Sequence, residues 1–222
     1  MRCLACFVLI AGVVMASPAL RAGAERGEKK EEGFRPLFNG VDLKGWKEYE
    51  GKPGNWVVEK DMLICKGQGG GWLGTEKDYD NFELRLEYRL LPAGNSGVYL
   101  RAPEKGWISR LGMEIQILDD AHPKYAKLKD WQYCGALYHV VGPSVKVTRP
   151  AGEWNEMRIR ANGRQVTVTL NGKKIVDANL DKALEDPAIA KEHPGLKRTT
   201  GKIGLQSHSE RVEFRNIRVR EL

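Results

Sequence analysis

Hydrophobic and polar residues alternate with a period of two along most of the chain beyond residue 34. Residues 81–90 (NFELRLEYRL) place all five of their apolar side chains on one face and all four charged side chains on the other. Residues 155–161 and 164–176 repeat the pattern. Successive side chains of a strand point to opposite faces, so this alternation predicts half-buried antiparallel strands.

Turn signals separate these segments. Asn171-Gly172 is a strong type I′ hairpin sequence, and Asn162-Gly163 provides a second turn shortly before it. The spacing of three between Phe214 and Ile217 predicts a β-bulge at residues 215–216. Only residues 180–193 have a helical pattern, which Pro187 interrupts. We therefore expect one all-β domain over residues 34–222, a jelly-roll β-sandwich of two antiparallel sheets.

The first residues have a different pattern. Residues 4–15 form an apolar run after Arg2, and the small residues Ala22-Gly23-Ala24 follow it. This arrangement is typical of a secretory signal peptide at residues 1–24, with an uncleaved membrane anchor as the alternative. The polar residues 25–33 are then a disordered leader. The sequence predicts a secreted or periplasmic protein with no membrane association after cleavage.

Charge and cysteine content narrow the classes further. The formal net charge of +7 falls to +5 without Arg2 and Arg21, and the basic residues are interleaved with acids. This pattern argues against a nucleic-acid partner. Cys65 and Cys134 remain in the exported chain, and their pairing is left open. The sequence contains no zinc motif and does not specify an oligomeric state.

The segment GMEIQILDD (112–120) is the first candidate site. Glu114 and Gln116 point to the same side of a predicted strand, about 7 Å apart. Asp119 and Asp120 follow directly. These groups could be a wet surface, but an amide beside a carboxylate also suits a binding site.

Two other strands carry polar groups. In GNSGVYLRA (94–102), alternation predicts that Tyr99 and Arg101 share a face, where Arg101 would bind a sugar or an enolate oxygen or pair with a surface acid. In GKIGLQSH (201–208), Gln206 and His208 end a strand. His208 is a candidate acid/base or metal ligand, and His139 is a second candidate; a structural role is the alternative for both.

Six tryptophans suit carbohydrate stacking or core packing. Trp56 and Trp154 open predicted strands, and we expect them in the core. Trp72 and Trp107 follow glycines in predicted loops, and we expect them to contact a ligand.

Several ordered motifs resemble one family across residues 34–222: PLFNGVDLKGW, GNSGVYLRA, GMEIQILDD, CGALY, GEWNEMRIRANGRQVTVTLNG and GKIGLQSHSERVEFRNIRVREL. The chain resembles the 3-keto-disaccharide hydrolase domain, whose members are also described as 3-keto-glucoside 1,2-lyases and hydratases. The resemblance implies a concanavalin A-like fold, a secreted or periplasmic location, and a carbohydrate substrate already oxidised at C3.

A ketone at C3 makes the C2 proton acidic, so a base can remove it and the aglycone leaves from C1; water then adds back. This route needs one base, a proton donor and a group that stabilises the enolate oxygen. We assign Glu114 and His208 as the catalytic pair, with Arg101 and Gln116 orienting the sugar. The other predicted substrate contacts are Tyr99, Gln206, His139, Trp107 and Trp72.

Three alternatives stay open. A divalent metal held by Glu114, His208 or Asp119 could replace or assist Arg101 at the keto oxygen, but the sequence alone specifies no cofactor. Related jelly-roll glucanases carry E-x-D-x-E, where this chain has Glu114, Gln116 and Leu118, so a conventional two-carboxylate glycosidase is disfavoured. A noncatalytic carbohydrate-binding module is the remaining alternative.

Overall fold

The computed structural model describes residues 32–222. The predicted signal peptide (1–24) and residues 25–31 of the predicted leader lie outside the described residues. Glu32 and Gly33, which the leader prediction includes, form a turn before the first strand. None of the described helices has the length and apolar character needed to cross a bilayer.

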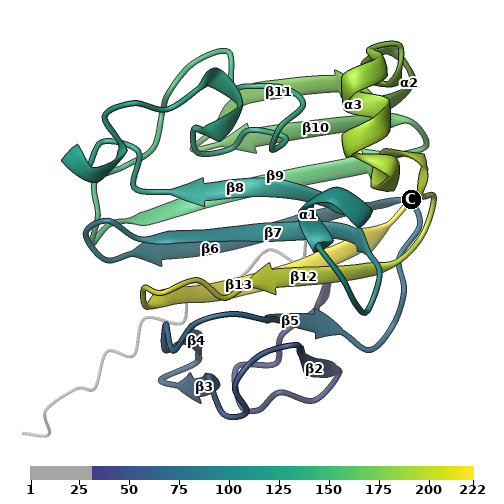
Figure 1. Cartoon of the computed structure of the whole chain (residues 1–222). Coiled ribbons are helices and arrows are strands. Elements are labelled where there is room, and N and C mark those ends of the chain that lie inside the picture. The colour runs from purple at the N-terminus through teal and green to yellow at the C-terminus, as the bar shows by residue number, and fades with distance from the viewer. Residues whose placement is uncertain (1–31) are drawn as a thin grey trace, which may run out of the picture. The chain divides into compact units, whose positions relative to one another are not determined.

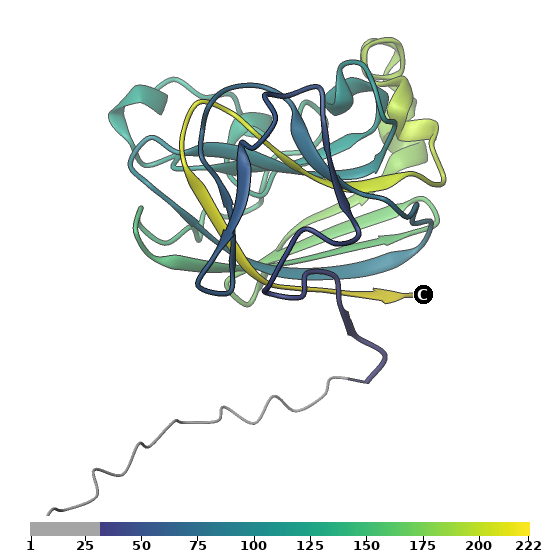
Figure 2. The same cartoon turned by 90° about the horizontal axis from the view of Figure 1, so that it is seen from below.

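Two antiparallel sheets stack face to face (Figure 1; Figure 2). The larger sheet runs β11 (Lys173–Asn179), β10 (Gln165–Leu170), β9 (Trp154–Asn162), β6 (Phe82–Leu90), β13 (Val212–Glu221), β4 (Met62–Cys65) and β3 (Trp56–Glu59), with β1 (Arg35–Pro36) paired to β13. The smaller sheet runs β2 (Trp46–Tyr49), β5 (Trp72–Thr75), β12 (Lys202–Gln206), β7 (Asn95–Ala102) and β8 (Met113–Leu118). The predicted β-sandwich of two antiparallel sheets is confirmed.

The predicted alternation explains the core. On β8, Met113, Ile115 and Ile117 are buried in the cluster that fills the space between the sheets. Trp56 lies in the same core, as expected. The expectation for Trp154 is wrong: alternation along β9 turns its ring to the outer face, where Arg89 and Arg215 lie over it.

The predicted turns and bulge are present. Asn171 and Gly172 both have positive φ, as a type I′ turn requires. The pairing of β13 with β6 shifts register between Arg215 and Arg218, and Asn216 has a φ of 51°.

The helices are few and short. They are α1 (Ile108–Leu111), α2 (Leu180–Leu184) and α3 (Pro187–Glu192), with the 3₁₀ turns η1 (Pro123–Tyr125), η2 (Asp130–Gln132) and η3 (Pro194–Lys197). The helical pattern is interrupted before Pro187, as predicted, because α2 ends at Leu184. Pro187 is then the first residue of α3, and the Asp186 side chain caps its first turn.

The two cysteines of the described chain are free and buried. The Cys65 thiol lies 3.4 Å from the Ser207 hydroxyl, and the Cys134 thiol lies 3.1 Å from the Tyr88 hydroxyl. The disulfide left open by the sequence is therefore not formed.

Arg101 corrects a site prediction. Leu100 and Arg101 of β7 lie opposite the single residue Ile203 of β12, a bulge in which Arg101 has a φ of 48°. The bulge breaks the alternation, so Arg101 does not share a face with Tyr99. The Arg101 side chain is fully buried.

The Arg101 guanidinium binds the protein itself. It donates to the backbone carbonyls of Asp80, Gly163 and Arg198 at 3.0–3.1 Å and to the Asn81 side chain at 3.3 Å. The prediction that Arg101 orients the substrate is wrong, because its donors tie three distant segments of the sandwich together.

We expect Arg101→Lys to lower the free energy of unfolding by roughly 3 kcal/mol, since the ammonium of a buried lysine cannot reach all four acceptors. Urea unfolding measures the loss. The matched control is Arg158→Lys on the exposed outer face, which should change stability by less than about 0.5 kcal/mol. Equal unfolding midpoints for the two variants would contradict the role given to Arg101.

Candidate active site

The outer face of the smaller sheet carries a row of glycines. Gly74 of β5 pairs with Gly204 of β12, which pairs with Tyr99 of β7, and Gly97 lies two residues before Tyr99. A Cβ at Gly97 would lie 2.3 Å from the Glu114 carboxylate. The missing side chains therefore leave room for large neighbours to lie close to the sheet.

Glu114 occupies the space above Gly97. It is 3 % exposed, on the opposite face of β8 from the core residues, as predicted. Burial raises the pKa of Glu114 to about 8, and a hydrogen bond with the Gln206 side chain partly offsets this effect. Glu114 is thus a carboxyl group that changes charge near neutral pH.

Gln206 and Tyr99 complete a polar group around Glu114. The Gln206 amide donates to the Tyr99 hydroxyl at 2.9 Å, so the hydroxyl hydrogen of Tyr99 is left for another acceptor. Burial, followed by the nearby Glu114 charge, raises the pKa of Tyr99 well above its usual value. Tyr99 therefore remains a donor at physiological pH. The structure thus brings together Tyr99, Gln206 and Glu114, three of the predicted site residues; their contact with a substrate stays a prediction.

Gln116 lies one step along the same face and is also buried. Its amide donates to the Asn95 side chain at 2.8 Å and more weakly to the carbonyls of Ser96 and Ile117. This position fixes the Gln116 side chain beside Glu114. A direct contact between Gln116 and a substrate stays a prediction.

Trp72 is in β5 and is 2 % exposed, so the predicted loop position is wrong. Tyr49 stacks on one side of its ring, with centroids 4.4 Å apart. Atoms of the Trp72 ring lie directly over Gly74 and Gly204, and the Tyr99 ring packs edge-on against Trp72 with centroids 5.8 Å apart. Because only 2 % of Trp72 is exposed, its ring offers no face on which a sugar could stack. Its Nε1 hydrogen has no partner within residues 32–222 and remains a free donor.

Residues 135–138 extend the smaller sheet beyond β8. Tyr138 donates its backbone N–H to the carbonyl of Glu114, while Leu137 packs in the core. The Tyr138 side chain consequently lies on the outer face, where burial and then the Glu114 charge raise its pKa. Sequence reasoning missed Tyr138, although alternation from Leu137 within CGALY could have identified it.

His139 belongs to an aromatic group beside Tyr138. Its ring lies 3.8 Å from the Trp131 ring and 5.1 Å from the His193 ring, measured between centroids. Trp131 packs edge-on against Tyr138. The predicted substrate contact of His139 stays a prediction, and Trp131 and His193 are neighbours that the sequence did not indicate.

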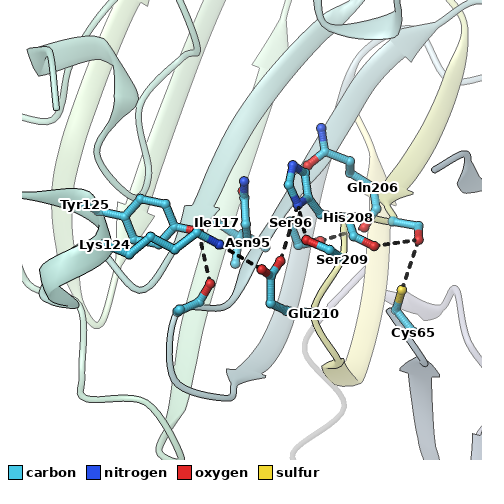
Figure 3. Close-up of polar contacts among 12 residues, drawn as sticks. Cys65, Asn95, Ser96, Ile117, Lys124, Tyr125, Gln206, His208, Ser209 and Glu210 are labelled. Atoms are coloured by element: carbon cyan, nitrogen blue, oxygen red, sulfur yellow. Dashed lines mark hydrogen bonds and ion pairs between the residues drawn. The ribbon is translucent and has the colours of Figure 1, made fainter. Parts of the chain in front are cut away.

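His208 lies beyond the end of β12 and is exposed (Figure 3). Its Nδ1 lies 3.0 Å from the Ser209 hydroxyl and 3.3 Å from the Glu210 carboxylate. Lys124 donates to the other oxygen of Glu210 at 2.9 Å. Burial raises the pKa of Glu210, but the hydrogen bonds from Lys124 and Ser209 outweigh it and lower the pKa overall. The pair His208–Glu210 is separate from Glu114 rather than bonded to it.

The Asp119 and Asp120 carboxylates accept hydrogen bonds from the backbone. Asp119 accepts from the N–H of Ala93, and Asp120 accepts from the N–H of Cys134. Within residues 32–222, the candidate metal ligands Glu114, His208 and Asp119 do not belong to any group of three ligating side chains. Among residues 32–222, three metal-ligating side chains come within 4.8 Å of one another at His139, Glu192 and His193.

Trp107 immediately precedes α1, which packs over β7 and β8 (Figure 1). Its side chain is 63 % exposed and the Arg110 guanidinium lies 3.9 Å from the ring centroid. The loop position predicted for Trp107 is correct, and its contact with a ligand stays a prediction.

This arrangement supplies one buried carboxyl group that titrates near neutral pH, surrounded by a hydroxyl, two amides and aromatic rings. A second carboxylate does not accompany Glu114 on β8, where Gln116 and Leu118 follow. The geometry suits proton transfer by a single base better than the two-carboxylate mechanism of most glycosidases.

A β-sandwich with aromatic and amide side chains on one outer face is typical of carbohydrate-active proteins. Residues 33–220 match the 3-keto-alpha-glucoside-1,2-lyase-like domain, and the chain belongs to this family. It is 28 % identical to a 3-keto-disaccharide hydrolase of Bacteroides thetaiotaomicron, over 86 % of this chain and 79 % of the relative.

Two solved structures of Parabacteroides distasonis proteins, described as candidate glycosyl hydrolases, are also similar. One is 29 % identical with a TM-score of 0.78, covering 86 % of this chain and 94 % of the other. The second is 32 % identical with a TM-score of 0.74, covering 85 % and 99 %. The family and these relatives support a glycoside hydrolase-type enzyme.

The pKa of Glu114 predicts a pH-dependent stability. In the folded protein the pKa rises from 4.5 to about 8, so the neutral carboxyl is favoured and stability falls as pH rises through this interval. Between pH 4.5 and 7 the wild type should lose roughly 3 kcal/mol more than Glu114→Gln. Denaturant unfolding across pH measures this, with Glu156→Gln as an exposed control. Parallel pH–stability curves for wild type and Glu114→Gln would exclude the raised pKa.

Proposed function

We propose that the protein cleaves 3-keto-glycosides by elimination and rehydration. A base removes the C2 proton, the electrons form a C1–C2 double bond conjugated to the ketone, and the C1–oxygen bond to the aglycone breaks. Water then adds at C1 while a proton returns to C2, giving net hydrolysis. The observation that supports this proposal is Glu114, a single buried carboxyl group with a pKa of about 8.

Glu114 is the proposed base. A general base is most effective when its pKa lies near the working pH, because it then combines a useful ionised fraction with strong basicity. An ordinary exposed glutamate is a much weaker base. Gln206 holds the carboxylate in place by its hydrogen bond, and Gly97 lets the carboxylate lie against the sheet.

The enolate oxygen at C3 needs a donor other than Arg101. The Tyr99 hydroxyl keeps its hydrogen free because it accepts from Gln206. Tyr99 lies beside the Glu114 charge, and we assign its hydroxyl to the developing oxyanion.

His208 is the proposed proton donor for the leaving group. The acid and base of an elimination act on different atoms, so they do not need to hydrogen-bond each other. Glu210 lies against Nδ1 of His208, so Nε2 is the nitrogen that remains available to donate to a substrate. Lys124 holds Glu210 in turn.

We propose that this reaction takes place outside the cytoplasm, in the periplasm or after secretion. The support is the signal-peptide pattern of residues 1–24. Recovery of mature protein that begins near residue 25 from the periplasm or medium tests it. Recovery of the uncleaved chain in the cytosol would contradict it.

Glu114→Gln should lower kcat/KM on a chromogenic 3-keto-glucoside by about 100- to 10,000-fold, since it removes the base while keeping the shape. In the wild type, the rising limb of the pH profile of kcat/KM should have its midpoint near pH 8, where Glu114 becomes ionised. Glu156→Gln, on the outer face of the larger sheet, is the matched control. Near-normal turnover by Glu114→Gln would contradict the assignment of Glu114 as the base.

Turnover in D₂O distinguishes elimination from direct displacement. Elimination should place one solvent deuterium at C2 of the released 3-keto sugar, detected by NMR. A parallel sample of the free 3-keto sugar with Glu114→Gln measures background exchange at C2. Hydrolysis without deuterium at C2 would contradict elimination, and sugar binding with no turnover would indicate a noncatalytic module instead.

A further inference from the structure

His139, Glu192 and His193 form a cluster that the proposed reaction does not use. Their ligand atoms all lie within 4.8 Å of one another. His139 follows Tyr138 in the segment beside β8, Glu192 ends α3, and His193 links α3 to η3. Two imidazoles and one carboxylate are a common ligand set for Zn²⁺ and similar divalent transition metals.

His193 is held in the orientation of a metal ligand. Its side chain is 2 % exposed, and its Nδ1 lies 3.4 Å from the carbonyl oxygen of Ser109. A hydrogen on Nδ1 fits this contact and leaves the lone pair on Nε2. That Nε2 is buried and has no hydrogen-bond partner within residues 32–222. A backbone carbonyl on one ring nitrogen and a metal on the other is the usual arrangement of a metal-binding histidine.

Close packing fixes His193 in this position. Gly195, two residues later, lies against α1, and a Cβ there would come within 2.3 Å of the backbone of Leu111 and Gly112. The carbonyl of Ser109 belongs to the same helix. The orientation of the His193 ring is therefore set by backbone packing rather than by a flexible loop.

The backbone of His139 provides a second, independent indication of a functional position. It adopts a φ of 66°, a left-handed conformation that is uncommon outside glycine and often marks a functional position. Trp131 lies against one side of its ring.

Glu192 closes the cluster from the surface. Its carboxylate lies 3.7 Å from Arg110, and its side chain is 48 % exposed. Tetrahedral zinc ligands lie about 3.4 Å apart, so small side-chain rotations would complete the site. Arg110 would then compete with the metal for Glu192.

We propose that His139, Glu192 and the Nε2 atom of His193 bind a divalent transition metal of the zinc class. The metal links the end of α3 to the segment that carries Tyr138 and leaves a fourth position for water. This site does not share a residue with the proposed acid and base, Glu114 and His208.

Titration of the tag-free, chelator-treated protein with ZnCl₂ tests the proposal by calorimetry and by metal content after dialysis. We expect one Zn²⁺ per chain and a higher Tm when it is bound. His139→Gln, His193→Gln and Glu192→Gln should each weaken binding by about tenfold or more. Glu192→Gln changes an exposed side chain, so it remains informative if His193→Gln does not fold. Arg110→Gln should strengthen binding severalfold by removing the competitor.

The chain contains four histidines, so the two outside the cluster provide matched controls. His122→Gln and His208→Gln should bind Zn²⁺ as the wild type does. Co²⁺ in place of Zn²⁺ should give visible d–d bands that disappear in the ligand variants. Absence of Zn²⁺ binding, or binding that Glu192→Gln and His139→Gln leave unchanged, would overturn the proposal. Loss of binding in His208→Gln would instead place the metal near the proposed acid.

Discussion

The packing of the smaller sheet against the larger one determines what its outer face can do. Apolar side chains of β7, β8 and β12 fill the space between the sheets, and they alternate strictly on β8 from Met113 to Ile117. A shift of one residue in the register of β8 would expose these side chains and bury their polar neighbours. The free energy gained by burying these apolar side chains therefore keeps Glu114 and Gln116 on the outer face. The chemistry proposed for Glu114 depends on this constraint, because the residue cannot turn away to water without disrupting the strand.

Glycines on the outer face of the smaller sheet determine how the Glu114 and Trp72 side chains pack. With any side chain at Gly97, the Glu114 carboxylate would be displaced, and with side chains at Gly74 and Gly204 the Trp72 ring would be displaced. The glycines thus allow a carboxyl group to be buried without a cavity in the core. This arrangement is unfavourable for stability, since burial raises the pKa of Glu114 and favours its neutral form. Arg101 has the opposite effect on stability: its guanidinium donates to three backbone carbonyls and stabilises the sandwich beside the site.

Local pattern was sufficient to predict the sandwich, the hairpins, the interrupted helix and the shared face of Glu114 and Gln116. It failed for Arg101, because a bulge in β7 depends on the pairing of that strand with β12, a segment a hundred residues later in the sequence. It failed for Trp72 because the glycines that receive its ring come from two strands. His193 was missed for the same reason: its surroundings come from α1 and from the segment beside β8. The features that the sequence predicted rest on short-range alternation, and those that it did not predict rest on long-range register.

Tyr138 and His139 show how closely the two proposed sites are connected. They are adjacent in the chain, yet Tyr138 lies near the Glu114 charge, whereas His139 lies beside His193. The left-handed conformation of His139 turns the backbone at this point. A metal on His139 would fix the peptide that positions Tyr138, and Trp131 contacts both rings. The proposed metal is therefore connected to the aromatic side of the catalytic face without contacting the substrate. The connection consists of the Tyr138–His139 peptide bond and the indole ring of Trp131.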